Sequence, residues 1–460
     1  MKKIEMPAGA RYIIEQLNNS GYEAFIVGGC VRDSLLGKNP SDWDITTSAT
    51  PYQVKELFAR TIDTGIQHGT VTVLVDRKIT GNMGEAGATS EYAFEVTTYR
   101  VDGIYEDHRR PKEVSFTSNL EEDLKRRDFT INAMAYNDEQ GVIDIFGGVK
   151  DLKAGIVKCV GNPTDRFDED ALRILRAVRF AAQLDFQIEE ETKIAMKKQC
   201  GFLKDISAER IQVELTKLII SDNPRKLVEA YELGLTAIIL PEFDRMINTP
   251  QNNPHHLYNV GLHTIKVMEN IPKNMVLRYT ALLHDSGKPE TRTTDEKGID
   301  HFYGHQEISS KITVEVLRRL KLDNNTIDAT KKLVLYHDYG ISDKVGEKTF
   351  RRFLSKLGVE NFKDFIAIRT ADLAGQSKYN AEKGIENIAH MEAMFEKITR
   401  EKHCLNLKDM AIGGKDLMDL GMKPGKIMGQ VLGQLLEEVL DEPEKNNRET
   451  LVQIVKEKYL

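Results

Sequence analysis

Two aspartates separated by one residue, Asp42 and Asp44, follow a glycine pair, and this combination could perform metal-assisted phosphate chemistry. Residues 25–44 read FIVGGCVRDSLLGKNPSDWD, which predicts a strand, a turn at Gly28-Gly29, a short helix and a second strand. Alternate residues of a strand share a face, so both carboxylates would point to one side. Paired carboxylates beside a helix N-terminus suit two divalent cations and a polyphosphate. A solvated hairpin with two exposed aspartates is the plain alternative.

Composition predicts a soluble protein of several domains. The 460 residues are too many for one core, so we expect two to four domains. The sequence is 40% hydrophobic and 29% charged, as in ordinary soluble proteins, and we expect no membrane span. Four widely spaced cysteines predict reduced thiols and a cytoplasmic location. The net charge of −7 argues against a general nucleic-acid coat, so RNA contacts must use local clusters of positive charge.

The elements around the two aspartates predict an α/β head of about 150 residues. The predicted elements are helices over 8–20, 51–59 and 119–136, and strands over 22–27, 70–75, 92–99 and 142–145. The strand at 92–99 can lie beside the aspartates, which makes Glu95 a candidate third carboxylate. A solvated glutamate on a strand is the alternative.

The glycine pair and the aspartates together resemble a known signature. GG-x-VRD followed by DWD is similar to the motif of DNA polymerase β-like nucleotidyltransferases, in particular the tRNA CCA-adding enzymes and bacterial poly(A) polymerases. The resemblance implies two Mg²⁺ ions on Asp42 and Asp44, with Glu95 as a further catalytic carboxylate. It also implies nucleotide contacts at the residues of the glycine turn and the following helix, Gly28, Gly29 and Arg32.

Two further stretches of the head resemble the same family. RRDFTINAMA at 126–135 matches a motif in which Arg127 corresponds to a triphosphate-binding arginine, and a guanidinium suits phosphate oxygens. A structural ion pair between Arg127 and Asp128 is the alternative. The polar, turn-rich segment 102–116 is similar to a loop that helps bacterial-type CCA-adding enzymes switch nucleotides. This similarity favours CCA addition over an A-only enzyme.

The stretch 166–186 predicts a helix that carries charged residues beside an apolar stripe. The charged residues recur every third position and are Asp170, Arg173, Arg176 and Arg179. A solvated face would be the ordinary explanation, but the stretch also resembles the EDxxRxxR motif of the family. The resemblance implies that Arg176 and Arg179 hold the nucleotide or the primer backbone.

The chemistry of the bases explains how Asp170 and Arg173 could select a nucleotide without a template. Cytosine and adenine both present an amino donor beside a ring-nitrogen acceptor, which a carboxylate and a guanidinium can pair. Uracil and guanine present the opposite pattern, so desolvated polar groups would stay unpaired. The pair therefore favours C and A together.

Histidines and aspartates recur in the second half of the chain, several of them where an apolar stretch ends. They occur in NVGLHTIKVMEN, LRYTALLHDSGKP, HFYGHQEISSKI, LYHDYG and IRTADLAGQ. One histidine on an apolar helix is usually a core residue, but the whole set resembles the HD metal-dependent phosphohydrolase superfamily. That resemblance implies metal ligands at His263, His284, Asp285 and Asp372, with His305 and His337 available to a second metal.

Imidazole and carboxylate ligands together favour a transition metal such as Mn²⁺, Ni²⁺ or Co²⁺ over Mg²⁺. Such a centre activates a water molecule toward a phosphate ester. We expect the substrate to be a damaged RNA 3′ end that carries a phosphate or a 2′,3′-cyclic phosphate. Its removal would restore the hydroxyl that the head needs.

Residues 407–440 again resemble CCA-adding enzymes, which implies a tail that binds tRNA by shape and backbone. The sequence thus predicts a multidomain protein with an α/β part and an all-α part. Its domains are a polymerase β-like nucleotidyltransferase head (1–150), a helical neck and body with the nucleotide-selecting helix (151–250), an all-α HD domain (251–375) and a helical tail (376–460).

The leading functional hypothesis is addition of C, C and A to tRNA 3′ ends from CTP and ATP, with tRNA rather than DNA as the partner. A poly(A) polymerase or a partial CC- or A-adding enzyme is the alternative of the same class. An HD phosphohydrolase with an RNA-binding head is the alternative of a different class. A non-catalytic RNA-binding scaffold would require both constellations of charged residues to be without function.

Overall fold

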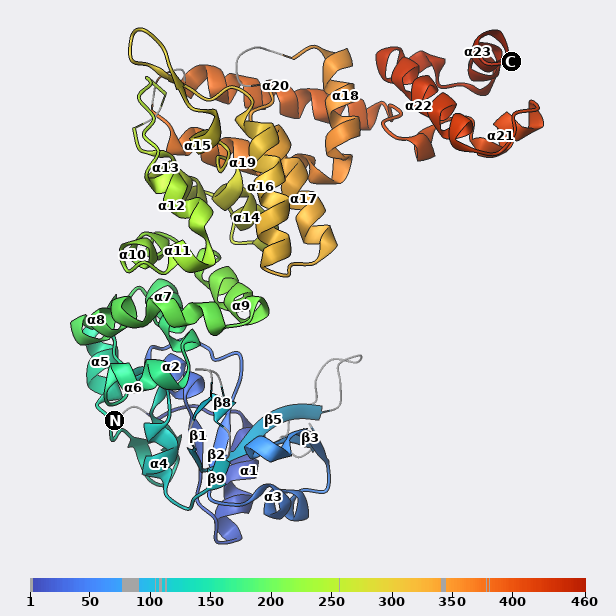
Figure 1. Ribbon diagram of the computed structural model, residues 1–460. Helices are drawn as coiled ribbons and strands as arrows, with labels where there is room; N and C mark the ends of the chain where they lie inside the picture. Colours follow the sequence, from blue (N-terminus) through green and yellow to red (C-terminus); the bar gives the residue numbers. More distant parts are fainter. Residues whose placement is uncertain are drawn as a thin grey trace. The chain divides into compact units, whose positions relative to one another are not determined.

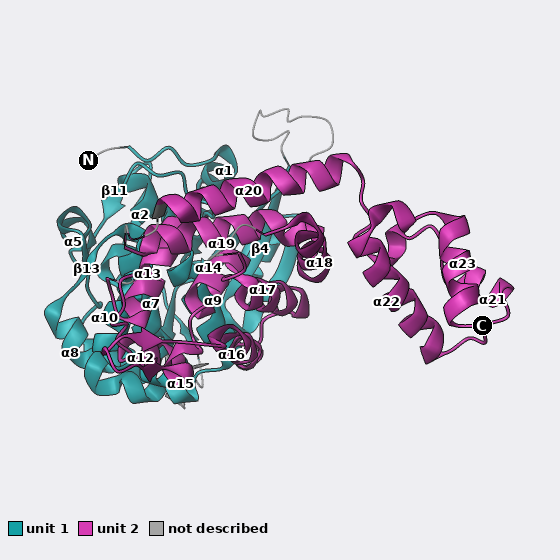
Figure 2. Cartoon of the chain, turned by 90° about the horizontal axis from the view of Figure 1, so that it is seen from above, with its two compact units in different colours: residues 1–239 teal, residues 240–460 magenta. Residues whose placement is uncertain are grey.

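The computed structural model describes residues 3–76, 91–103, 105–106, 110–111, 114–255, 257–340, 345–377, 379 and 381–460. The chain divides into two compact units, Met1–Ile239 and Leu240–Leu460 (Figure 2). The predicted domain boundaries near residues 150, 250 and 375 are finer than this division and stay predictions. Within the described residues, no helix combines the length and the apolar character needed to cross a bilayer.

The head in the first unit is built on a mixed sheet, which the described residues show with seven strands in the order β11-β10-β1-β2-β5-β4-β3 (Figure 1). The strands are β1 (Ala24–Val27), β2 (Ile45–Thr47), β3 (Thr61–Gly65), β4 (Thr70–Asp76), β5 (Glu91–Thr98), β10 (Ala135–Asn137) and β11 (Gly141–Ile143). Neighbouring strands are antiparallel except β2 and β5, which run parallel with Ile45 opposite Val96. This parallel pair positions the candidate carboxylates.

Helices cover the sheet of the head as the sequence predicts. They are α1 (Ala8–Asn19), α2 (Gly29–Leu35), α3 (Pro51–Leu57) and α4 (Leu120–Lys125), with short 3-10 turns η1 (Ile66–His68) and η2 (Thr130–Asn132). Helices α1 and α3 pack against each other and against the sheet (Figure 1). Thr50 caps α3 in a reciprocal arrangement with Gln53, so the local signal at Thr50-Pro51 is sufficient to begin that helix.

The predicted helix over 119–136 is wrong beyond its first turns. Helix α4 ends at Lys125, and the following backbone pairs with residues far along the chain. Thr130 N donates to Lys158 O (2.9 Å), and Val160 N donates to Asp128 O (3.2 Å). These tertiary hydrogen bonds replace the helical ones, and they hold the motif at 126–135 in an irregular conformation.

Four short strands follow β5 in the region of the predicted flexible segment 102–116. They are β6 (Arg100–Asp102), β7 (Tyr105–Glu106), β8 (Arg110–Pro111) and β9 (Val114–Phe116). Strand β6 pairs with β9, and β7 pairs with β8. The remaining residues of this segment lie outside the described residues, so its role in nucleotide choice stays a prediction.

The neck completes the first unit and is mostly helical. Its elements are α5 (Gly148–Ala154), β12 (Ile156–Val157), α6 (Pro163–Glu169), α7 (Leu172–Leu184), β13 (Gln187–Ile188), α8 (Glu190–Gln199), η3 (Cys200–Asp205), α9 (Ala208–Ile219), α10 (Lys226–Glu232) and α11 (Thr236–Ile239). The single helix predicted over 166–186 is broken at Asp170, which is extended and whose side chain caps the next helix at Leu172 N. Helix α7 is largely buried and packs against α9.

The described residues of the second unit are helical apart from one small hairpin. Its first part contains α12 (Pro241–Ile247), α13 (Val260–Asn270), α14 (Met275–Leu283), α15 (Lys288–Thr291), β14 (Thr293–Thr294), β15 (Asp300–His301), α16 (His305–Arg319), α17 (Asn324–Tyr336), α18 (Glu347–Leu357), η4 (Val359–Asn361), α19 (Phe362–Gly375) and α20 (Ala381–Arg400). Helices α13, α14, α16, α17 and α19 contact one another and form a bundle (Figure 1).

The end of the chain forms a smaller helical cluster. Its elements are η5 (Leu407–Asp409), α21 (Gly414–Asp419), α22 (Lys426–Asp441), η6 (Pro443–Lys445) and α23 (Arg448–Lys458). The cluster has its own apolar core, in which Leu417, Leu435 and Leu451 are fully buried. Arg351 of α18 donates to the carbonyls of Leu440 and Asp441, which joins this cluster to the preceding helices. The predicted order of an α/β head followed by helices is confirmed.

Candidate functional site

The three predicted carboxylates of the head line one cavity of about 690 Å³. Glu95 lies in β5, and Asp42 and Asp44 lie in the extended segment just before β2, so the predicted strand begins later than expected, at Ile45. The backbone of Asp44 nevertheless continues the sheet, because its carbonyl accepts from Val27 N (3.0 Å). The parallel pairing of β2 with β5 thus brings the three side chains together.

The electrostatics of this cavity favour a divalent cation. Asp44 is exposed in the cavity, yet the surrounding protein removes enough water to raise the pKa of its carboxyl group. Arg127 opposes this rise, whereas the charges of Glu95 and Asp42 add to it. The negative charge of the three carboxylates is only partly compensated by one guanidinium. This arrangement fits Mg²⁺, which prefers carboxylate oxygens and keeps several bound waters.

Gly28 and Arg127 form a corner that suits the phosphates of a nucleotide. Gly28 has a φ of +78°, and a Cβ there would lie 3.0 Å from Arg127 Nη1, so the guanidinium packs directly over the glycine turn. Arg127 Nε is buried and, among the described residues, has no hydrogen-bond partner. The predicted alternative, an ion pair with Asp128, is wrong, because Arg127 lies 3.5 Å from Asp123.

Arg32 is held by the protein itself. Its Nη1 donates to Asn132 Oδ1 (2.7 Å), and its Nε donates to Asp33 Oδ1 (2.8 Å). The side chain is 9% exposed and packs over the ring of Phe180. These contacts favour a structural role, joining α2 to the motif at 126–135, and a nucleotide contact at Arg32 stays a prediction.

The arginines of α7 also have carboxylate partners within the protein. Arg173 pairs with Glu169 four residues earlier (2.5 Å), Arg176 Nε donates to Asp128 (2.8 Å), and Arg179 Nε lies 2.5 Å from Glu214. The alternative of a solvated face is therefore wrong. Burial lowers the pKa of Arg179 to about 10, although Glu214 acts in the opposite direction. The contacts of Arg176 and Arg179 favour a structural role, and their nucleotide contacts stay predictions.

Asp170 stands at the break between α6 and α7, where its carboxylate is held from two sides. Its Oδ1 accepts from Leu172 N (3.0 Å), and its Oδ2 accepts from Arg210 Nη2 (2.7 Å). Each oxygen retains a second lone pair that can accept from a base. Sequence reasoning missed Arg210, which lies forty residues away from Asp170 and whose partner no local pattern indicates.

Replacing Asp128 with asparagine is expected to lower the free energy of unfolding of the first unit by about 3 kcal/mol at pH 7, the cost of breaking a buried ion pair. Burial acts to raise the pKa of Asp128, but Arg176 and Asn132 hold it well below its ordinary value. This stabilisation is therefore present above the unfolded-state pKa of about 3.9 and is lost as the pH falls toward the folded-state value.

Urea unfolding monitored by Trp43, the single tryptophan of the chain, reports on this unit. The difference in free energy of unfolding between the wild type and Asp128→Asn should become smaller below about pH 4. Glu139→Gln, at an exposed position, is the control and should change little at either pH. Equal stability of Asp128→Asn and the wild type at pH 7 would contradict this role of the pair.

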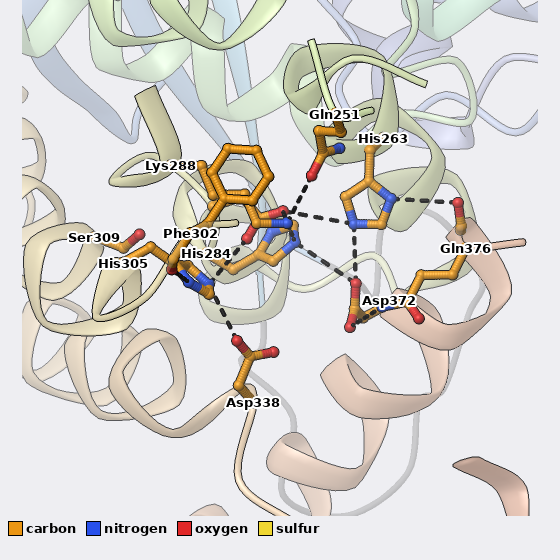
Figure 3. A network of polar contacts seen from close by, with 12 residues as sticks. Gln251, His263, His284, Lys288, Phe302, His305, Ser309, Asp338, Asp372 and Gln376 are labelled. Atoms are coloured by element: carbon orange, nitrogen blue, oxygen red, sulfur yellow. Dashed lines mark hydrogen bonds and ion pairs between the residues drawn. The ribbon is translucent and has the colours of Figure 1, made fainter. Parts of the chain in front are cut away.

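The histidines and aspartates of the second unit converge in the centre of the helical bundle (Figure 3). His263 comes from α13, His284 and Asp285 from the end of α14, His305 from the start of α16, His337 and Asp338 from the end of α17, and Asp372 from α19. Three groups of them place their ligand atoms within 4.8 Å of one another: His263, His284 and Asp372; His284, Asp285 and His337; and His305, His337 and Asp338.

Asp285 lies between two groups of histidines. Its Oδ2 is 3.3 Å from His284 Nε2 and 3.7 Å from His263 Nε2. Its Oδ1 is 3.4 Å from His305 Nε2 and 3.7 Å from His337 Nε2. Because each oxygen faces a different pair of imidazoles, one carboxylate can serve two neighbouring metal positions.

Backbone carbonyls orient these imidazoles toward the centre. The Nδ1 atoms of His284, His305 and His337 donate to the carbonyls of Ala281 (2.8 Å), Phe302 (2.8 Å) and Val334 (2.7 Å). A proton on Nδ1 leaves the Nε2 lone pair free for a metal, which is the usual outer-shell arrangement of metal-binding histidines. His284 Nε2 is buried and, within the described residues, makes no hydrogen bond. This donor set fits a transition metal.

The charge of the cluster also supports a transition-metal site. Burial acts to lower the pKa of His305, but the carboxylates of Asp285 and Asp338 raise it to about 10. Burial acts to raise the pKa of Asp285, but His284 and Lys288 hold it well below its ordinary value. Without a bound metal, protons on the imidazoles therefore supply positive charge to the site. Metal binding would displace these protons.

Sequence reasoning missed two residues of this centre, Lys288 and Gln376, whereas it included Asp338 beside His337. Lys288 Nζ lies 2.8 Å from Asp285 Oδ2 and donates to Gln251 Oε1 (2.8 Å), so it adds a buried positive charge. Gln376 Nε2 donates to Asp372 Oδ2 (2.9 Å). Asp338 adjoins His337 and lies 3.1 Å from His305 Nε2. The spacing of Lys288, three residues after Asp285, was the one signal that could have indicated its position.

Three family models match successive parts of the chain. Residues 24–158 match the poly A polymerase head domain, residues 185–247 a probable RNA and SrmB-binding site of polymerase A, and residues 291–455 a putative tRNA nucleotidyltransferase domain 2. The fold and the head site are thus similar to those of nucleotidyltransferases with a poly A polymerase head. This resemblance was predicted from the motifs at 25–44 and 126–135 and is confirmed.

Among curated proteins, the chain is similar to CCA-adding enzymes. That of Ligilactobacillus salivarius is 48% identical over 219 residues, which cover 48% of this chain and 51% of the relative. That of Lactobacillus helveticus is 49% identical over 219 residues, with the same 48% and 51% coverage. The chain therefore spans about half the length of the curated relatives it matches.

Solved structures extend the similarity to nearly the whole fold. The CCA-adding enzyme of Bacillus stearothermophilus, solved in complex with CTP, superposes with a TM-score of 0.69 at 27% identity, covering 98% of both chains. The CCA-adding enzyme of Thermotoga maritima, complexed with tRNA, gives a TM-score of 0.55 at 23% identity, with 97% of this chain and 94% of that chain covered. The predicted family resemblance is confirmed.

Proposed function

We propose that the protein adds C, C and A to the 3′ ends of tRNAs, using CTP and ATP and no nucleic-acid template. The observation that carries this proposal is the head cavity, in which Asp42, Asp44 and Glu95 lie together and Arg127 packs over the glycine turn. The similarity to CCA-adding enzymes supplies the choice of substrate. The free thiols of the four cysteines agree with a cytoplasmic location.

Each part of the head would contribute a distinct step. Asp42, Asp44 and Glu95 would hold Mg²⁺, which would supply activation of the attacking hydroxyl and stabilisation of charge at the α-phosphate. Arg127 binds the triphosphate through donors that the protein leaves partly unused. Asp170 accepts from the amino group of C or A while Arg210 and Leu172 N fix its orientation. Arg173 donates to the ring nitrogen.

Extension of three tRNAs tests this function and separates it from its rivals. The tRNAs end before CCA, after C and after CC, and each is incubated with CTP and ATP, singly and together. CCA addition predicts that each tRNA is completed to CCA and no further. A long A-tail would identify a poly(A) polymerase, addition of only C or only A would identify a partial enzyme, and no extension would overturn the proposal.

Replacing Asp170 with alanine is expected to reduce the preference for CTP and ATP over UTP and GTP by about a hundredfold or more, since a site built to hydrogen-bond a base rejects analogues strongly. The measurement is kcat/KM for each of the four nucleotides. Asp165→Ala, at an exposed position on the same helix α6, is the control and should keep the preference. Full selectivity in Asp170→Ala would remove Asp170 from base recognition.

We further propose that the histidine–aspartate cluster is an HD-type metal centre that hydrolyses phosphate esters at RNA 3′ ends. Support comes from the convergence of four imidazoles and three carboxylates, with backbone carbonyls fixing three of the imidazoles. A bound transition metal would supply an activated water molecule and polarise the phosphate. Lys288 adds a buried positive charge beside Asp285, where a phosphate anion would be attracted.

A further inference from the structure

An exposed aromatic pair stands at the mouth of the cavity that contains the histidine–aspartate cluster. Tyr303 is 79% exposed, and its ring is stacked on that of His301 with centroids 5.4 Å apart and an angle of 6° between the planes. A single exposed tyrosine is ordinary on a protein surface. This one differs because its orientation is held by a chain of contacts and because it lines the cavity.

The contacts behind Tyr303 make the pair a fixed platform. His301 belongs to the hairpin of β14 and β15, and its Nε2 lies 3.1 Å from Asp295 Oδ2. Asp300, next to it, is 2% exposed and accepts from Asn252 N (2.9 Å), which anchors the hairpin to the bundle. The imidazole of His301 thus supports one face of the Tyr303 ring.

The chain connects this platform directly to the metal ligands. Gly304, with a φ of +73°, turns the backbone from Tyr303 into α16, whose first residue is His305. The cavity has a volume of about 450 Å³, within the range of sites that hold small ligands. Its lining includes the rings of Tyr303 and His301 and the charged groups of Lys288, Asp285 and Asp372.

We propose that Tyr303 is the stacking platform for the terminal nucleobase of an RNA 3′ end whose phosphate ester lies at the histidine–aspartate cluster. The position of the phosphate rests on the hydrolase function proposed above, whereas the stacking of the base does not. A ring whose orientation is already fixed by the His301 imidazole binds a flat base at low entropic cost. Stacking accepts any base because each base has a π-face. The platform therefore suits tRNA ends that stop at different nucleotides.

Binding of a fluorescent nucleotide tests the platform directly. The probe is 2-aminopurine riboside 3′-phosphorothioate, a slowly hydrolysed ester whose fluorescence is quenched on stacking. The full chain carries Asp42→Ala to silence the head and is loaded with Mn²⁺. Tyr303→Ala should raise the Kd about tenfold and abolish most of the quenching, whereas Tyr303→Phe should keep both, because stacking requires the ring and not the hydroxyl.

Tyr52→Ala is the matched control. Tyr52 lies in the head and is 68% exposed, so this substitution removes a ring that is also accessible to solvent. It should bind the probe as the parent does. Quenching and affinity that are equal in Tyr303→Ala and the parent would overturn the proposal. Because Tyr303 is exposed, its replacement leaves the core intact, and circular dichroism can verify this.

Hydrolysis of two RNA ends separates this proposal from the hydrolase function. One RNA carries a 2′,3′-cyclic phosphate on adenosine and the other carries it on an abasic ribose. Tyr303→Ala should raise KM about tenfold for the adenosine end only, with kcat unchanged. Hydrolysis of both ends with no effect of Tyr303→Ala would overturn the platform and retain the hydrolase. Quenching that depends on Tyr303 without any hydrolysis would retain the platform and overturn the hydrolase.

Discussion

Alanine at Asp42 or at Asp44 is expected to reduce nucleotide incorporation by about a thousandfold or more, whichever nucleotide is supplied. A catalytic metal contributes several kcal/mol of transition-state stabilisation, and each 1.4 kcal/mol corresponds to about a tenfold change in rate. Both side chains are exposed in the head cavity, so neither replacement creates a hole in the core. The loss should therefore appear in kcat while the fold is retained.

Single-nucleotide extension of a tRNA that ends before CCA measures this effect. Asp63→Ala is the matched control, because Asp63 is an exposed aspartate of the same sheet whose partner is Lys55 on the surface. Hydrolysis by the second unit should be unchanged in all three variants. Retention of incorporation by Asp42→Ala and Asp44→Ala would remove the head carboxylates from catalysis.

Replacing Asp285 with asparagine is expected to abolish most hydrolysis by the second unit and to leave nucleotide addition by the head unchanged. The substitution keeps the volume of the side chain but removes the charge that faces both groups of histidines. Because this carboxylate faces both proposed metal positions, we expect loss of bound transition metal and a decrease in hydrolysis of about a thousandfold. Addition of C, C and A should continue, since the head carboxylates are untouched.

Metal content by elemental analysis and hydrolysis of a 2′,3′-cyclic phosphate RNA end are the two measurements. Asp328→Asn, at an exposed position on α17, is the control and should retain metal and activity. Continued nucleotide addition by Asp285→Asn shows that the variant is folded. Full hydrolysis in that variant would contradict the proposed metal centre, and loss of both activities would indicate general unfolding.

The structure also changes how the neck is understood. The arginines of α7 were predicted to face nucleotide or primer, but Asp128 and Glu214 engage Arg176 and Arg179 inside the unit. Asp170 was predicted to lie within one helix but instead lies at the break between α6 and α7, where Arg210 is its partner. Base selection, as proposed, would therefore depend on a carboxylate whose orientation is set by Arg210 of α9.

Local signals were sufficient where structure depends on neighbours in sequence. Thr50-Pro51 predicted the start of α3, and the β-branched runs predicted β4 and β5, because caps and side-chain alternation are properties of a few adjacent residues. The motif at 25–44 indicated the class of enzyme through its resemblance to a known signature of adjacent residues. The candidate metal ligands were likewise implied by the resemblance to the HD superfamily, and ligand chemistry indicated only the kind of metal.

Tertiary structure alone decided which residues meet. The motif at 126–135 leaves the helical conformation because its backbone pairs with residues near 159, and Arg176 finds its partner 48 positions away. His263 meets Asp372 across 109 positions, and no local pattern records such a contact. The sequence by itself thus determined the chemistry that this protein can perform. Only the packing of distant segments decided which of its charged groups are bound to each other and which remain available to substrates and metals.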